Sequence, residues 1–338
     1  IRDRYKRNVD YKRQGGSMSD PQSARPQSMR IPEWWSTFDN FTDWQSLVLR
    51  TAPIQSYEAS ASGASDMGTV FFSVGYMDQD GIVKETNYNR LNARLNASLN
   101  ITKNIQVGMN ASVSRSVQKA AGTNLGDRQG KDSSVHHALM MSPLVAPGVS
   151  VNSNGGIPSS DEYGAAWLDP LEQLYNTKDD TETTRAQISI WGEWKMLPGL
   201  SYKIQYSNNY DGEQYEYFQP GELTDSKIAE GSSYSSHTND WVIQNTLTYD
   251  NTFKGHHLNV LLGQSAEKQT YYIGNMEATG WPYDQLTTLN LASTAKLAST
   301  ERTAYTNASF FGRLSYDYKE KYLMTVSVRR DGSSRFGQ

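Results

Sequence analysis

Residues 88–119 contain two successive segments in which apolar and polar residues alternate. From Leu91 to Ile101 every second residue is apolar, and the residues between them are polar; after a short turn at 102–104 the same alternation resumes at Ile105. A period of two indicates a β-strand with one apolar and one polar face. A soluble sheet can alternate in this way, but repeated long hairpins with a hydrated second face are typical of outer-membrane β-barrels.

The same alternation returns along most of the chain. It predicts about ten strands, at 54–62, 69–77, 88–101, 105–118, 184–195, 200–206, 241–249, 258–262, 310–318 and 322–328. Short connections (63–67, 102–104, 196–199, 251–256, 319–321) alternate with longer ones (78–87, 119–183, 211–239, 268–303). Outer-membrane barrels have short periplasmic turns and long extracellular loops. We therefore expect residues 1–53 to form an extracellular loop, residues 54–338 to form part of a barrel, and the three longest connections to be extracellular.

Composition narrows the class of protein further. Only 37% of the 338 residues are hydrophobic, and no run of about 18 apolar residues occurs, which excludes a membrane-spanning helix. A barrel strand escapes this test because only alternate residues must be apolar. The net charge of -4 and the lack of a dense basic patch argue against nucleic acid as a partner. The absence of cysteine excludes disulfides, thiolate metal sites and cysteine nucleophiles.

Charged residues on the polar face are the first set of candidate site residues. These are Arg90, Arg94, Arg185, Glu193, Lys203, Arg313 and Asp317. In a barrel they would face the lumen, where they would contact a plug or line the path of a solute. Simple hydration of the lumen wall is the alternative.

Aromatic residues in the predicted loops are the second set. Trp34, Trp35, Tyr163, Trp167, Trp281 and Tyr283 have flat amphipathic side chains suited to stacking on sugar rings or packing on a partner protein. Packing within the loops is the alternative. Two adjacent histidine pairs, at 136–137 and 256–257, are not expected to bind metal, because neighbours on a strand point to opposite faces. No catalytic motif is recognisable, so neither an enzyme nor a cofactor is expected.

Several stretches resemble the SusC-like TonB-dependent outer-membrane transporters, in the family's order and over most of the chain. They are residues 42–45, 50–55 and 60–63, the run Gly75-Tyr76-Met77-Asp78-Gln79-Asp80-Gly81-Ile82-Val83-Lys84, the strand from Tyr88 to Arg94, residues 169–171 and 174–176, and the closing segments Phe311–Tyr318 and Tyr322–Gly337. The sequence starts without methionine and stops just after a predicted strand, so we expect a piece of a longer chain.

The resemblance implies a transmembrane antiparallel barrel of about 22 strands, closed by a plug domain that lies outside this sequence. It implies TonB-dependent import of oligosaccharides or peptides across the outer membrane, with a SusD-like surface lipoprotein as partner, TonB engaged through an N-terminal region not present here, and outer-membrane lipid around the barrel. Two alternatives remain open: a soluble β-sandwich that binds glycans at the cell surface, which would need apolar packing on its second face, and an outer-membrane barrel enzyme.

Overall fold

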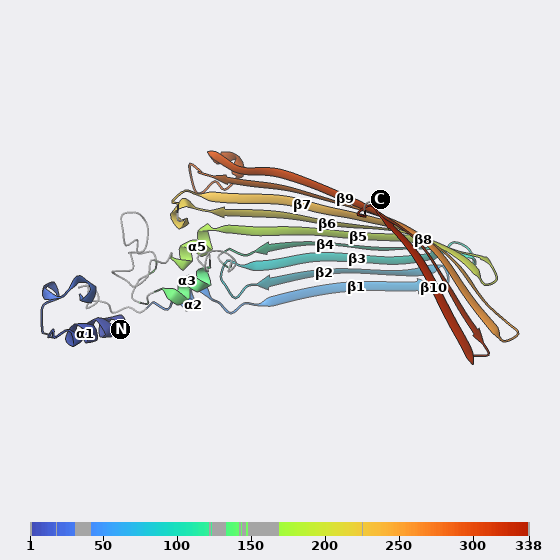
Figure 1. The fold of residues 1–338 in the computed structure, drawn as a ribbon, viewed down its shortest axis with the longest axis horizontal. Helices are drawn as coiled ribbons and strands as arrows, with labels where there is room; N and C mark the ends of the chain where they lie inside the picture. Colours follow the sequence, from blue (N-terminus) through green and yellow to red (C-terminus); the bar gives the residue numbers. More distant parts are fainter. Residues whose placement is uncertain are drawn as a thin grey trace.

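The computed structural model describes residues 2–17, 19–30, 42–121, 123, 133–141, 143, 147, 169–224 and 226–336. Ten strands form one antiparallel sheet in which each strand pairs with the next along the chain (Figure 1). The strands are β1 (Ile54–Ser65), β2 (Gly68–Asp80), β3 (Asn87–Asn100), β4 (Ile105–Lys119), β5 (Lys178–Leu197), β6 (Leu200–Gln219), β7 (Glu230–Phe253), β8 (His256–Thr279), β9 (Thr294–Tyr318) and β10 (Tyr322–Ser333). The predicted all-β class and the number of strands are confirmed. Because all ten described strands lie in one sheet, the β-sandwich alternative is wrong.

The helices are short and lie outside the sheet. They are α1 (Arg2–Arg13), α2 (Trp44–Val48), α3 (Ser134–Met140) and α5 (Pro170–Asn176), with 3₁₀ turns η1 (Gln22–Ala24), η2 (Gln27–Met29), η5 (Gly221–Leu223) and η6 (Leu289–Leu291). None of the described helices has the length and apolar character needed to cross a membrane.

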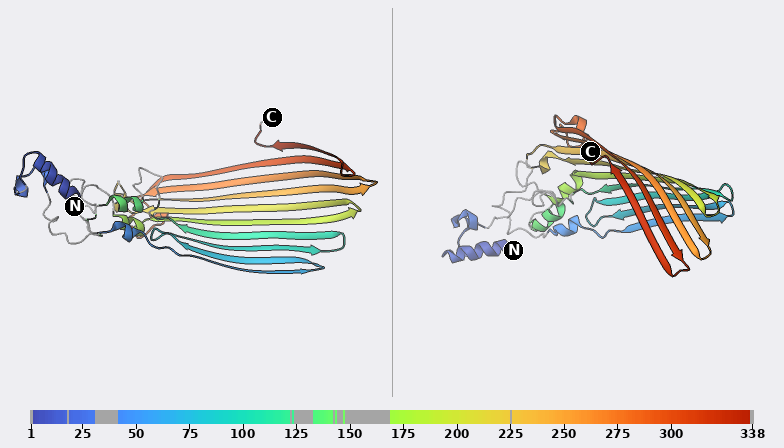
Figure 2. Two further views of the ribbon diagram at one scale, coloured as in Figure 1. Left: turned by 90° about the horizontal axis from the view of Figure 1, so that it is seen from below. Right: turned by 45° about the vertical axis from the view of Figure 1, so that its right-hand side comes forward.

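Tight turns connect the strands at one end of the sheet. The turn between β7 and β8 consists of Lys254 and Gly255, with φ of 50° and 83°. Two successive residues in the left-handed region are typical of the hairpin turn that matches the natural twist of paired strands. The longer connections all lie at the opposite end, where α2, α3 and α5 gather (Figures 1 and 2).

Two of the long loops are much shorter than the sequence predicted. The expected loops 211–239 and 268–303 are largely strand: β6 continues to Gln219, β7 begins at Glu230, β8 ends at Thr279 and β9 begins at Thr294. The connections are therefore 220–229 and 280–293. The prediction was wrong because polar, aromatic and aliphatic residues are mixed on both faces of these segments, so the apolar period ends while the backbone hydrogen bonding continues.

None of the described elements covers the apolar face of the sheet. Leu91, Ile190, Leu262 and Val326 are 54%, 50%, 55% and 48% exposed. On β5 the apolar run of this face extends from Ala186 to Trp194, which matches the roughly 9–11 residues with which a tilted strand crosses a bilayer. A continuous exposed apolar surface of this kind is typical of faces that contact a membrane or another protein.

Several polar side chains on the apolar face are hydrogen-bonded to one another. Arg115 on β4 and Glu182 on β5 form a two-pronged ion pair of 2.6 and 2.7 Å. The hydroxyl of Tyr202 donates to Asn245 at 2.6 Å, and the Asn245 amide donates to Gln264 at 2.8 Å. These bonds matter because a polar group without a partner is costly in hydrocarbon.

The largest apolar cluster lies in the connections rather than in the sheet. Trp44, Val48, Ala138 and Leu174, from α2, α3 and α5, pack together and are at most 6% exposed. His137 on α3 is 1% exposed, and burial, with a smaller contribution from His136, lowers its pKa to about 4. The described parts of the 119–183 connection are therefore folded and packed.

Candidate functional site

The strand register places all seven charged candidates on one face of the sheet. Residues directly opposite one another in paired strands point to the same side. Glu193 lies opposite Lys203, and Arg185 lies opposite Asp211; further partner rows link these residues to Arg90 and Arg94 on β3 and to Arg313 and Asp317 on β9.

This polar face is hollowed at the middle of the sheet. A hollow of about 590 Å³ is lined by residues from β1 through β8, including three of the candidates, Arg90, Arg94 and Arg185. Figure 2 shows that the sheet is curved. Because eight adjacent strands contribute residues to one hollow, the polar face is the concave one. The other four candidates, Glu193, Lys203, Arg313 and Asp317, share the face but do not line the hollow.

The candidates differ in how their charges are compensated. Arg185 Nε lies 2.8 Å from Asp211 Oδ2, in a pair whose side chains are 65% and 50% exposed; a pair this exposed contributes roughly 0–1 kcal/mol. The Lys203 ammonium lies 5.0 Å from the ring centroid of Trp191. Asp317 contacts His257 Nδ1 at 2.9 Å. Arg90 and Arg94 make no hydrogen bond or ion pair with any residue that the structure describes.

Two aromatic side chains on the polar face were missed by the sequence analysis. Trp191 lies across Gly108 on β4, and Phe311 lies across Gly263 on β8; each pair is directly opposite in the register. A Cβ at position 108 would lie 2.4 Å from the Trp191 ring, and one at 263 would lie 2.2 Å from the Phe311 ring. A glycine opposite an aromatic residue on the neighbouring strand is the sequence signal that could have found them.

A tyrosine cluster on the same face, toward the long-loop end, was also missed. Tyr215 and Tyr234 stack with ring centroids 5.0 Å apart, and the Tyr234 hydroxyl donates to Glu213 Oε1 at 2.5 Å. These residues lay in the segment predicted to be a loop, so no common face was predicted for them.

The structure separates the loop aromatic residues. Trp281 is only 8% exposed; its ring meets Phe218 edge-on at 5.1 Å, and its Nε1 donates to the Thr288 carbonyl at 3.0 Å. Packing against β6 and within its own loop therefore accounts for the position of Trp281, and its role as a binding residue stays a prediction. Tyr283 is 67% exposed. Trp34, Trp35, Tyr163 and Trp167 lie outside the described residues.

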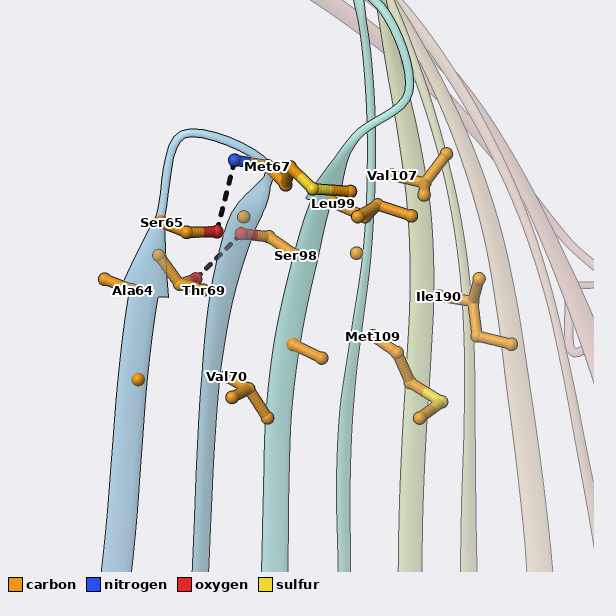
Figure 3. A pocket seen from close by; sticks show the side chains of 14 residues that line it. Ala64, Ser65, Met67, Thr69, Val70, Ser98, Leu99, Val107, Met109 and Ile190 are labelled. Carbon is orange, nitrogen blue, oxygen red and sulfur yellow. Dashed lines mark hydrogen bonds between the residues drawn. The ribbon is translucent and has the colours of Figure 1, made fainter.

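A second hollow, of about 570 Å³, opens on the apolar face near the tight turns. Figure 3 shows its lining, in which Val70, Leu99, Val107, Met109 and Ile190 surround smaller residues. Its walls offer almost no polar surface, so it suits hydrocarbon and not a polar solute.

The structure places the two histidine pairs in different surroundings. His136 and His137 lie on α3 rather than in a turn. His257 sits between two carboxylates, with Nε2 3.1 Å from Asp250 and Nδ1 2.9 Å from Asp317. Among the described residues no group of three or more histidine, aspartate and glutamate side chains could hold a metal ion.

Comparison with known proteins gives relatives of one kind. The TonB-dependent receptor P39 of Formosa agariphila is 29% identical over 82% of this chain and 26% of its own length, and the TonB-dependent receptor SusC of Bacteroides thetaiotaomicron is 25% identical over 88% of this chain and 31% of its own. The chain thus spans about a third or less of these relatives. No family model matches.

Solved structures share the sheet. A structure of the RagAB peptide transporter superposes with a TM-score of 0.73 at 22% identity, over 89% of this chain and 34% of the other. The unliganded ferric citrate transporter FecA gives a TM-score of 0.50 at 10% identity, over 83% of this chain and 35% of its own. These likenesses establish the fold. Together with the sequence relatives, they show that the chain is similar to a segment of the barrel of SusC-like TonB-dependent receptors of the outer membrane.

Proposed function

We propose that the protein to which this chain belongs actively imports oligosaccharides or peptides across the outer membrane, powered through TonB. The observation that carries the proposal is the two-faced sheet: an exposed apolar surface as tall as a bilayer, backed by a hollowed polar surface with charged side chains. The relatives that share this sheet are receptors and transporters. We propose transport by gated passage, with no covalent step.

The proposed barrel includes strands beyond those described. β1 and β10 each pair with only one described neighbour, and lipid tolerates a sheet only when every strand edge is paired. The relatives are about three times as long as this chain, which leaves enough sequence for about 22 strands in total and for a plug.

We propose that the tight turns are periplasmic and that the connections at the opposite end are extracellular. This orientation follows the usual asymmetry of outer-membrane barrels. It would place the packed helices α2, α3 and α5 and the exposed Tyr283 outside the cell, where a SusD-like surface lipoprotein would meet them. An exposed tyrosine on an ordered loop is well suited to such an interface.

Uptake in the producing bacterium tests the function. Deleting the full-length gene should abolish growth on one class of oligosaccharide or peptide, and complementation should restore it. Loss of TonB should abolish uptake while leaving solute binding by the purified protein intact. The proposed partnership is tested by deleting only the gene of the candidate surface lipoprotein. Uptake that is unchanged without TonB would refute energy coupling, and uptake that is unchanged without the lipoprotein would refute the partnership.

A further inference from the structure

We propose that Arg90 and Arg94 bind an anionic group, a carboxylate or a sulfate, on the transported solute. This inference rests on the proposed function and adds a chemical requirement to it. Both side chains are exposed on the polar face of β3 and line the 590 Å³ hollow.

The positive charge of this part of the sheet is not compensated by its neighbours. In the register Arg90 lies between Met77 on β2 and Ser116 on β4, and Arg94 lies between Ser73 and Ser112. Among the residues of β2, β3 and β4 that share this face, none is acidic. Glu58 on β1 is the acid on that side of the hollow, two strands away from β3, which is about 10 Å.

The remaining lining residues supply neutral hydrogen-bond donors. Asn92 lies between the two arginines on the same face of β3, with Ser114 directly opposite. Gly75, its partner on β2, leaves room for the Asn92 amide, because a Cβ at position 75 would lie 3.0 Å from Asn92 Oδ1. Two guanidinium groups with an amide and hydroxyls around them form a donor set that suits an oxyanion, since arginine binds carboxylates and sulfates through paired N–H donors.

The third arginine of the hollow differs from these two. Arg185 is already held by Asp211 at 2.8 Å. A solute anion would therefore gain most from Arg90 and Arg94, whose guanidinium groups have no described partner to give up.

Equilibrium binding to the purified full-length transporter tests the proposal. The probes are matched pairs: a trisaccharide of uronic acids and the same trisaccharide with its carboxyl groups reduced, a sulfated trisaccharide and its desulfated form, and a tripeptide and its C-terminal amide. The protein variants are the double substitution Arg90→Gln with Arg94→Gln, and the control Lys268→Gln with Arg330→Gln. The control removes the same charge from exposed positions on the opposite face.

The native protein should bind the anionic member of one pair at least tenfold more tightly than its neutral counterpart, a difference of about 1.4 kcal/mol. The arginine variant should lose this preference while retaining affinity for the neutral member, and the control should keep it. The pair that shows the effect identifies the source of the anion.

Three results would overturn the proposal: no preference for any anionic probe in the native protein, a preference that survives in the arginine variant, or equal weakening of anionic and neutral probes. The last result, with a lowered unfolding midpoint, would assign the arginines to contacts within the full-length protein. Binding is measured without TonB, so a failure of the import proposal would appear in uptake and not here.

Discussion

Replacing Ile190 by arginine is expected to destabilise the full-length protein by about 2–4 kcal/mol, the range for a cationic side chain near the bilayer midplane of a barrel. Ile190 is 50% exposed on the apolar face of β5. It lies four residues from each end of the apolar run Ala186–Trp194, which is about 13 Å along the strand and, at a tilt of about 40°, about 10 Å along the membrane normal. Ile190 is therefore at the middle of the apolar band.

The measurement is reversible unfolding in denaturant of protein folded into lipid vesicles, compared with the matched variant Gln187→Arg. Gln187 lies three residues before Ile190 on β5 and is exposed on the polar face, so its substitution should change the free energy of unfolding by less than about 0.5 kcal/mol. A loss of stability at position 187 equal to that at 190, or a loss below about 1 kcal/mol at 190, would refute the assignment of the two faces.

Other positions give sharper local tests. Gly108→Val should displace the Trp191 ring, which lies 2.4 Å from the position of the new Cβ, and lower the free energy of unfolding by about 1–3 kcal/mol; an unchanged denaturation midpoint would contradict this. The pKa of His137 is lowered to about 4, so the unfolded chain binds more protons than the folded one between about pH 6.5 and 4. The packed helices α2, α3 and α5 should therefore lose protection from hydrogen exchange as pH falls through this window. The substitution His137→Gln should remove this pH dependence. A cysteine at Tyr283 should react with an impermeant reagent on intact cells while one at Lys103 should not, and the reverse would invert the proposed orientation.

The sequence was sufficient to predict structure wherever one face of a strand is apolar and the other polar. On β3 the alternation of Leu91, Ala93 and Leu95 with polar residues fixed the strand, its face and the tight turn that follows. On the outer half of β8 both faces are mixed, as Thr270, Tyr271 and Tyr272 illustrate, so no period marks the strand and only its pairing with β7 and β9 maintains it.

The candidate site was predicted in part for the same reason. The alternation along each strand was enough to predict that Arg90, Arg94 and Arg185 share one face, because successive residues of a strand point to opposite sides of the sheet. The burial of Trp281 depends on Phe218, 63 positions earlier in the chain, and no local pattern can report such a contact. The stacking of Tyr215 on Tyr234 likewise required a register between two segments that the sequence presented as loop.

The extra length of the later strands also affects how the protein would meet a solute. β8 has 24 residues, a length of about 80 Å, and at a tilt of about 40° it would rise about 60 Å along the membrane normal, twice the thickness of the hydrocarbon core. In the proposed orientation the outer mouth is thus walled by hydrogen-bonded strands that extend beyond the hydrocarbon core, with the connections 220–229 and 280–293 at their tips. A wall of this kind loses little conformational freedom when a solute docks on it, so more of the contact energy remains as affinity.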